Sequence, residues 1–171
     1  MLPNHPYRIL TVCTGNICRS PIAEVVLAER FAANGLQDRV VIDSGAISSE
    51  ELGNPMDPRA RKVLLAHGYP DHRHSARQVD PAWLGERDLV LAMTSGHAAA
   101  LRRLAVTDEE RLRIRLYREF DPASPQGVSE QELDINDPWY GDMTDFEQTI
   151  SYIEAGADPI VDFVRARIEA G

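Results

Sequence analysis

The segment Val12–Pro21 reads Val-Cys-Thr-Gly-Asn-Ile-Cys-Arg-Ser-Pro and joins two stretches of different pattern. Before it, Ile9–Val12 is short, apolar and rich in β-branched residues, which predicts a buried strand. After it, the apolar residues of Ile22–Phe31 recur at helical spacing. Ser20 suits the N-cap of this helix, and Pro21 suits its first residue. The pattern therefore predicts a strand, a tight loop and a helix in succession.

A cysteine opens this loop and an arginine closes it. Backbone N–H groups converge where a loop enters a helix N-terminus, and the helix dipole adds positive potential, so such a loop suits a phosphate-like dianion. The same field favours the thiolate of Cys13, which is the nucleophilic form. Arg19 is placed to donate two hydrogen bonds to a bound phosphoryl group. Gly15 and Asn16 tolerate the left-handed backbone of a tight loop.

The octet Cys13–Ser20, followed by Pro21 and preceded by a strand, resembles the signature loop of the low-molecular-weight protein tyrosine phosphatases. The alternative is a buried cysteine in an ordinary strand-to-helix turn, in which the other loop residues would be coincidental. The resemblance implies that Cys13 is the nucleophile, that Arg19 holds phosphate and that Ser20 hydrogen-bonds to the Cys13 sulfur. It also implies a substrate-binding loop made of Thr14, Gly15, Asn16, Ile17, Cys18 and Ser20.

Strand and helix patterns alternate along the chain. Strands are predicted at 7–12, 40–42, 88–93 and 113–117, and helices at 20–34, 58–67, 95–105 and 146–168. Gly156 and Pro159 are expected to kink or split the last helix, and 118–144 is expected to be a long loop with a short helix near Gln131. Such alternation predicts a three-layer α/β fold, a parallel sheet with helices on both faces. The family resemblance implies four strands in the order 2-1-3-4, with the phosphate-binding loop after strand 1.

The long loop supplies candidates for the general acid that a phosphate ester needs when its leaving group departs. Spacing alone does not distinguish Asp134, Asp137, Asp142 and Asp145. Asp137 has the better physical case, because Pro138 restricts its backbone and the Trp139 and Tyr140 rings are able to wall the site and partly desolvate the carboxylate. Asp137-Pro138-Trp139-Tyr140 also resembles the acid loop of these phosphatases, which implies that Asp137 is the acid.

Two further segments match the family. In His74-Ser75-Ala76-Arg77-Gln78 the histidine would hydrogen-bond to Asn16, whereas the alternative is a surface histidine. Ser44 matches a serine that also supports the loop. The resemblance further suggests a reversible disulfide between Cys18 and Cys13, with a free thiol packed beneath the loop as the alternative. The remaining histidines are interpreted as structural or surface residues: His5, His67, His72 and His97.

Composition limits the classes of protein. The 171 residues suit one domain, 1–171. A net charge of −9 without a basic tract argues against nucleic-acid binding. No signal-peptide pattern or membrane-length apolar run occurs, so we expect a cytoplasmic protein without membrane association. Both cysteines lie in the loop, so neither a disulfide framework nor a metal site is expected. We expect no cofactor, and a monomer or weak dimer.

The sequence thus predicts a phosphatase that hydrolyses phosphotyrosine in protein substrates through a phosphocysteine. One departure from the family concerns substrate choice: Glu50-Glu51 stands where the family often carries a Trp-His pair, which should weaken binding of acidic phosphopeptides. Alternatives are a protein-arginine phosphatase, in whose relatives threonine replaces Ile17, and an inactive phosphate-binding module. An arsenate reductase of this fold would need resolving cysteines downstream, and no cysteine follows Cys18.

Overall fold

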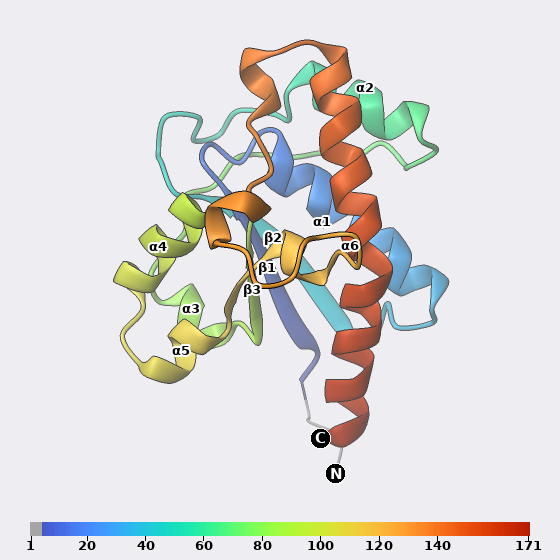
Figure 1. Cartoon of the computed structure of the whole chain (residues 1–171). Helices are drawn as coiled ribbons and strands as arrows, with labels where there is room; N and C mark the ends of the chain where they lie inside the picture. Colours follow the sequence, from blue (N-terminus) through green and yellow to red (C-terminus); the bar gives the residue numbers. More distant parts are fainter. Residues whose placement is uncertain (1–4) are drawn as a thin grey trace.

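A parallel sheet forms the centre of the molecule, in a computed structural model that describes residues 5–171. Within these residues, four strands pair in the order β2-β1-β3-β4, all parallel, as the resemblance implied (Figure 1). The strands are β1 (Tyr7–Cys13), β2 (Val40–Ala46), β3 (Leu89–Ala92) and β4 (Ile114–Leu116). Because β1 is an inner strand, its carboxyl end opens in the middle of the sheet edge, where ligands bind in such folds.

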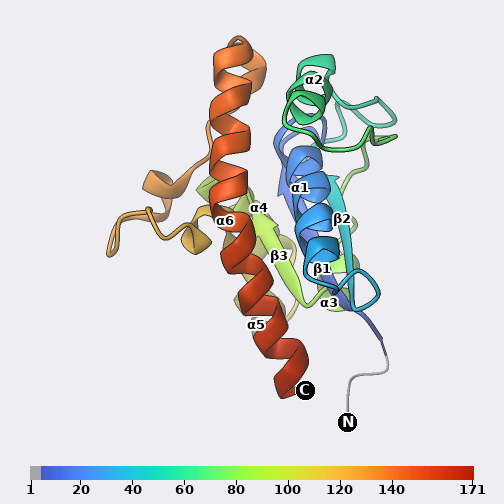
Figure 2. The same ribbon diagram turned by 90° about the vertical axis from the view of Figure 1, so that its right-hand side faces the viewer.

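Helices cover both faces of the sheet. One face carries α1 (Arg19–Ala33), α2 (Pro58–Ala66) and α6 (Met143–Ala170); the other carries α3 (Trp83–Glu86), α4 (Ser95–Leu104) and α5 (Asp108–Leu112). Figure 2 shows α1 and α6 side by side in front of the sheet. Strand residues alternate between two buried clusters: Ile9 packs with α1 and α6, whereas Leu10 packs with α4. The three-layer prediction is confirmed.

The first helix begins earlier than the sequence pattern predicted. Ser20 is not its N-cap and Pro21 is not its first residue, because α1 starts at Arg19 with Cys18 at the N-cap. The hydroxyl of Ser20 lies 3.0 Å from the Cys13 sulfur, so it serves the loop and not the helix end. At the other end, Gly35 has a φ of 71°, the left-handed geometry expected after the helix C-terminus.

The last helix is not split at Gly156 and Pro159, and the alternative expectation of a kink stays a prediction. Residues Met143–Ala170 form one helix of 28 residues with Pro159 inside it. At Gly156 a Cβ would lie 2.9 Å from Cε1 of Tyr117, so this glycine permits close packing. The Tyr117 hydroxyl donates to the carbonyl of Ile153, one turn earlier, at 2.6 Å. The contacts of Tyr117 with Gly156 and Ile153 therefore help the helix to continue past Gly156 and Pro159.

The remaining elements are short helices in the connections between the strands and the longer helices. The segment 117–142 is mostly irregular, as expected, but holds three short 3₁₀ helices, η1 (Tyr117–Phe120), η2 (Glu130–Leu133) and η3 (Pro138–Tyr140). The pattern did not predict α3 or α5; α5 is set locally by a capping box between Thr107 and Glu110. Across residues 5–171, no helix combines the length and apolar character that crossing a membrane requires.

Candidate active site

A pocket opens at the carboxyl end of β1. It is lined by Cys13, Thr14, Gly15, Ile17, Cys18, Arg19, Ser48, Glu50, Glu51, Asp137, Trp139 and Tyr140. Two predicted substrate-binding residues do not line it, because Asn16 and Ser20 are fully buried behind the loop. They act on the sulfur from beneath: the Ser20 hydroxyl lies 3.0 Å and the Asn16 amide nitrogen 3.3 Å from Sγ of Cys13. Both groups are placed to stabilise negative charge on sulfur.

Asn16 holds the loop in shape from its centre. Its φ is 61°, in the left-handed region that asparagine tolerates better than most residues. Its side-chain amide donates to Ser20 Oγ at 2.8 Å and to Ser44 Oγ at 2.9 Å, and its side-chain oxygen accepts from the backbone N–H of Arg77 at 3.0 Å. These bonds tie the loop to α1, to β2 and to the segment after α2.

Arg19 lines the pocket, and two of its three guanidinium nitrogens contact other residues of the chain. Nη1 donates to the carbonyl of Ile135 at 2.8 Å, and Nη2 lies 3.4 Å from Oδ2 of Asp137 and 3.5 Å from Oγ1 of Thr14. Within the part of the chain that the structure describes, Nε is buried without a hydrogen-bond partner. A buried donor without a partner is costly, so an anion in the pocket would supply a missing acceptor.

Among the four candidate acids, Asp137 is the one that lines this pocket. Asp134 accepts from the backbone N–H of Ser95 at 2.6 Å, near the start of α4. Asp142 caps α6 and accepts from the N–H of Thr144 at 2.9 Å, while Asp145 accepts from the N–H of Asp142 at the same distance. These three carboxylates therefore serve helix termini. Asp137 also caps a short helix, because it accepts from the N–H of Trp139 at 3.1 Å at the start of η3, but unlike the other three it lines the pocket and lies 3.4 Å from Nη2 of Arg19.

Two histidines contact the loop. Nε2 of His74 lies 2.6 Å from the carbonyl oxygen of Asn16, and burial lowers the pKa of His74. Nε2 of His97 lies 2.8 Å from Oγ1 of Thr14, and burial together with the nearby Arg19 lowers the pKa of His97 to about 4. The sequence reasoning missed His97, which it treated as a structural or surface residue. Its position three residues after the Thr94 N-cap places it in the first turn of α4, beside the loop.

Asp57 and Arg59 connect the phosphate-binding loop to the acid loop. The N–H of Asp57 donates to the carbonyl of Ile17 at 2.9 Å. Arg59 pairs with Asp57 at 2.9 Å and donates to the carbonyls of Trp139 at 3.2 Å and Gly141 at 3.1 Å. Sequence reasoning predicted a helix at 58–67 and gave no role to Asp57 or Arg59, so it missed this link. The local sequence offers one hint of this contact, an arginine directly after Pro58 at the start of a helix.

The pocket rim combines aromatic and acidic side chains. Trp139 and Tyr140 are 49% and 82% exposed, with ring centroids 5.0 Å apart, and Ile17 supplies an apolar surface. Glu50 and Glu51 also line the pocket. Gly15 lets Glu51 approach, because a Cβ there would lie 3.1 Å from its Cγ. The pocket therefore presents flat apolar walls near its mouth together with two carboxylates.

The second cysteine of the loop differs from the first. Cys13 and Cys18 are both free thiols, and both are buried. Burial, reinforced by the nearby Asp57 carboxylate, raises the pKa of Cys18, so this residue stays protonated at neutral pH. Cys18 packs as a free thiol in the core, and the reversible disulfide with Cys13 stays a prediction.

Comparison with known proteins agrees with this geometry. The family model for low molecular weight phosphotyrosine protein phosphatase matches residues 8–169. A low molecular weight protein-tyrosine-phosphatase of Streptomyces coelicolor is 42% identical over 163 residues, covering 95% of this chain and 96% of the relative. A crystal structure of a protein tyrosine phosphatase from Entamoeba histolytica with Hepes in the active site has a TM-score of 0.84 at 25% identity, covering 94% of this chain and 97% of that one.

A second structural neighbour is named for a different activity. A mutant of the YwlE arginine phosphatase with a phosphorylated active-site serine has a TM-score of 0.76 at 24% identity, covering 92% of this chain and 95% of that one. At this identity the likeness shows a shared fold alone. The family match covers nearly the whole described chain, and the similarity to the Streptomyces coelicolor relative extends over the same length. This chain therefore belongs to the low molecular weight phosphotyrosine protein phosphatase family of hydrolases.

Proposed function

We propose that this chain hydrolyses phosphotyrosine monoesters of proteins through a phosphocysteine, with Cys13 as nucleophile, Arg19 as phosphate clamp and Asp137 as general acid and base. The observation that carries the proposal is the convergence of these three side chains on one pocket. Ser20 and the backbone N–H of Asn16 lie within hydrogen-bond distance of the Cys13 sulfur. Among the described residues, the buried Nε of Arg19 has no hydrogen-bond partner and is able to donate to a bound phosphate.

In the first step the Cys13 thiolate attacks phosphorus, and the bond between phosphorus and the phenolic oxygen breaks. Arg19 Nε and Nη2 donate to the equatorial oxygens, where charge is greatest in the transition state. Protonated Asp137 gives its proton to the departing oxygen, so phenol leaves and not phenoxide. The Ser20 hydroxyl and the Asn16 amide hold the sulfur before attack.

In the second step the roles of Asp137 and Cys13 are reversed. The Asp137 carboxylate removes a proton from a water molecule, whose oxygen attacks phosphorus, and the bond between sulfur and phosphorus breaks. Inorganic phosphate and the Cys13 thiolate are released, and Asp137 is protonated again for the next cycle. The hydrogen bond from Ser20 makes the thiolate a better leaving group.

Hydrolysis of para-nitrophenyl phosphate in excess EDTA tests the chemistry. We expect turnover without added metal, no turnover for Cys13→Ser, and a loss of about 10²–10⁴-fold for Asp137→Asn. The loss should be larger for phenyl phosphate, because phenol is the poorer leaving group and depends more on protonation.

Asp134→Asn is a matched control for the acid. Asparagine caps helices about as well as aspartate, so the contact with Ser95 is retained and activity should stay near that of the unsubstituted protein. Full activity of Cys13→Ser would overturn the mechanism. An equal loss in the two Asp→Asn variants would overturn the role of Asp137.

Two pocket residues bear on the choice between phosphotyrosine and phosphoarginine. Ile17 lines the pocket and offers an apolar contact that favours a phenyl ring over a charged guanidinium. The carboxylate of Glu50 favours a cation, so Ile17 favours phosphotyrosine whereas Glu50 favours phosphoarginine. We propose that Ile17 decides, because it belongs to the loop that holds the phosphate. The ratio of kcat/KM for phosphotyrosine and phosphoarginine peptides should favour phosphotyrosine, and Ile17→Thr should reduce that ratio.

We propose further that the chain acts as one domain in the cytoplasm, as a monomer or weak dimer, and that hydrolysis needs no cofactor. The acidic composition and the continuous buried core support this proposal. Analytical ultracentrifugation tests the oligomeric state, and the EDTA assay tests the requirement for metal.

A further inference from the structure

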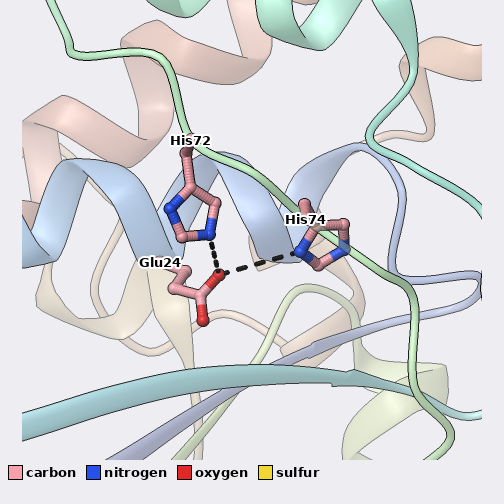
Figure 3. A group of neighbouring side chains, drawn as sticks. All are labelled: Glu24, His72 and His74. Atoms are coloured by element: carbon pink, nitrogen blue, oxygen red, sulfur yellow. Dashed lines mark ion pairs between the residues drawn. The ribbon is translucent and has the colours of Figure 1, made fainter.

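A glutamate and two histidines meet beside the phosphate-binding loop, which His74 contacts at Asn16, and none of the three lines the pocket. Figure 3 shows the three side chains. Glu24 projects from α1, and His72 and His74 project from the segment after α2. Nε2 of His72 lies 3.2 Å from Oε2 of Glu24, and Nδ1 of His74 lies 3.9 Å from the same oxygen. One donor atom from each residue lies within 4.8 Å of the other two.

The hydrogen bond of His74 fixes which of its nitrogens faces the cluster as an electron-pair donor. Nε2 lies 2.6 Å from the carbonyl oxygen of Asn16, and a carbonyl only accepts, so Nε2 carries the hydrogen. In the neutral ring Nδ1 therefore has a free electron pair, directed toward Glu24. A histidine whose second nitrogen donates to a backbone carbonyl is the usual arrangement of a metal ligand.

The spacing of the three donor atoms fits a small divalent cation. Four ligands at about 2.0–2.1 Å from a tetrahedral zinc ion lie about 3.4 Å from one another. Oε2 of Glu24 lies 3.2 Å from Nε2 of His72 and 3.9 Å from Nδ1 of His74, on either side of that value, and all three donor atoms lie within 4.8 Å of one another. The side chains of His74 and Glu24 are 5% and 15% exposed and that of His72 is 39% exposed, so a water molecule has access to the fourth position.

We propose that Glu24, His72 and His74 bind a divalent transition-metal ion of the zinc class, and that the bound ion stabilises the phosphate-binding loop through His74 and Asn16. Two imidazole nitrogens and one carboxylate oxygen are a donor set that suits zinc better than calcium or magnesium, which prefer oxygen alone. The expectation of no metal site came from the cysteines. This cluster uses none, and it lies outside the catalytic pocket.

The ion would act on the loop by two routes. Metal at Nδ1 makes the Nε2–H of His74 a stronger donor to the Asn16 carbonyl. It also fixes Glu24, whose Oε2 accepts from Ser44 Oγ at 3.4 Å, and Ser44 in turn accepts from the Asn16 amide. Both routes end on Asn16, the residue that holds the loop in its left-handed turn.

The charges around the cluster favour a cation. Glu29 and Asp71 line the same hollow as Glu24 and His72. Arg77 is a nearby opposing charge, and it shares the Asp43 carboxylate, 2.9 Å away, with Arg87. The Asp71 carboxylate is paired with Arg61. Among the ion pairs of residues 5–171, Glu24 contacts the two histidines and no arginine, so its carboxylate is the charge that favours the ion.

Zinc binding is measured on tag-free Cys13→Ser protein by isothermal titration calorimetry in a buffer without phosphate. This substitution removes the thiol that would otherwise compete for zinc, while the buried Cys18 stays protonated. We expect one zinc per chain, and we expect a zinc concentration of about one hundred times Kd to raise Tm by roughly 5–10 °C. In the same background His72→Gln should weaken binding more than tenfold, because even loss of an outer partner of a ligand costs 10–100-fold.

His67→Gln is the matched control. His67 lies 2.7 Å from Glu147 and 3.2 Å from Glu154, so it is another histidine beside carboxylates, but it is outside the cluster. Zinc affinity should be unchanged in this variant, and His72 is exposed enough for its own substitution to leave the fold intact. Absence of zinc binding to the Cys13→Ser protein, unchanged binding by His72→Gln, or loss of binding in His67→Gln alone would each overturn the proposal.

Discussion

Substitutions of Asn16 test whether this residue determines the shape of the loop. Its side chain makes three hydrogen bonds, to Ser20, to Ser44 and from the Arg77 backbone. Each contributes about 1 kcal/mol to the free energy of unfolding. Alanine at a φ of 61° adds a backbone cost of about 1 kcal/mol relative to asparagine. Asn16→Ala should therefore lower the free energy of unfolding by about 4 kcal/mol.

Asn16→Gly separates the two contributions. Glycine loses the same three hydrogen bonds but adopts a positive φ without strain, so the loss should be about 3 kcal/mol. The expected order, with glycine about 1 kcal/mol more stable than alanine, is the reverse of the order at ordinary helical or extended positions. Ser44→Ala removes one of the three bonds and should cost about 1 kcal/mol.

Urea unfolding of the four proteins, with midpoints converted through a common m-value, measures these differences. The kcat of the folded Asn16 variants on para-nitrophenyl phosphate should fall by about tenfold to a hundredfold, because the amide beneath Cys13 and the loop around it are displaced. A loss below about 1 kcal/mol for Asn16→Ala, or an alanine variant more stable than the glycine variant, would refute the reasoning.

Three other predictions concern packing, charge and pH. Gly156→Ala should destabilise the protein by about 1–3 kcal/mol in urea unfolding, because the new Cβ meets the Tyr117 ring at 2.9 Å. Replacing Glu50 and Glu51 by glutamine should raise kcat/KM for acidic phosphopeptides roughly threefold to tenfold at low salt, and the gain should disappear at high salt. His97 has a folded-state pKa of about 4, below its unfolded value, so the unfolded state binds more protons between about pH 6.5 and 4. Stability should fall by up to about 3 kcal/mol as pH decreases through this range, and His97→Gln should flatten the profile of unfolding free energy against pH.

The sequence predicts most of the scaffold because the signals there are local. Short β-branched runs mark the strands and a run of distinctive residues marks the loop, so each is visible within about ten positions. The start of α1 was misplaced because Ser20 has the chemistry of an N-cap but uses its hydroxyl on Cys13. A split of the last helix was among the expectations because the residue that packs against Gly156, Tyr117, is distant in sequence.

The parts of the site that escaped prediction are contacts between distant segments. Arg59 reaches the carbonyls of the acid loop from the start of α2, and His97 reaches Thr14 from α4. The cluster of Glu24 with His72 and His74 joins α1 to a segment without periodic pattern. Spacing within one segment does not show such pairs, because only the folded sheet brings their elements together.

The packing of α6 against α1 has a consequence for the order in which activity is acquired. A ribosome makes the nucleophilic loop first and the acid loop with α6 last, yet α1 is covered by α6 and Arg19 is held by a carbonyl next to the acid loop. The nascent chain thus carries Cys13 long before the pocket around it is complete. A polypeptide that stops ahead of the final helix would lack the packing of α6 on α1, the helix that begins at Arg19, so under the mechanism proposed above it would not hydrolyse phosphate esters.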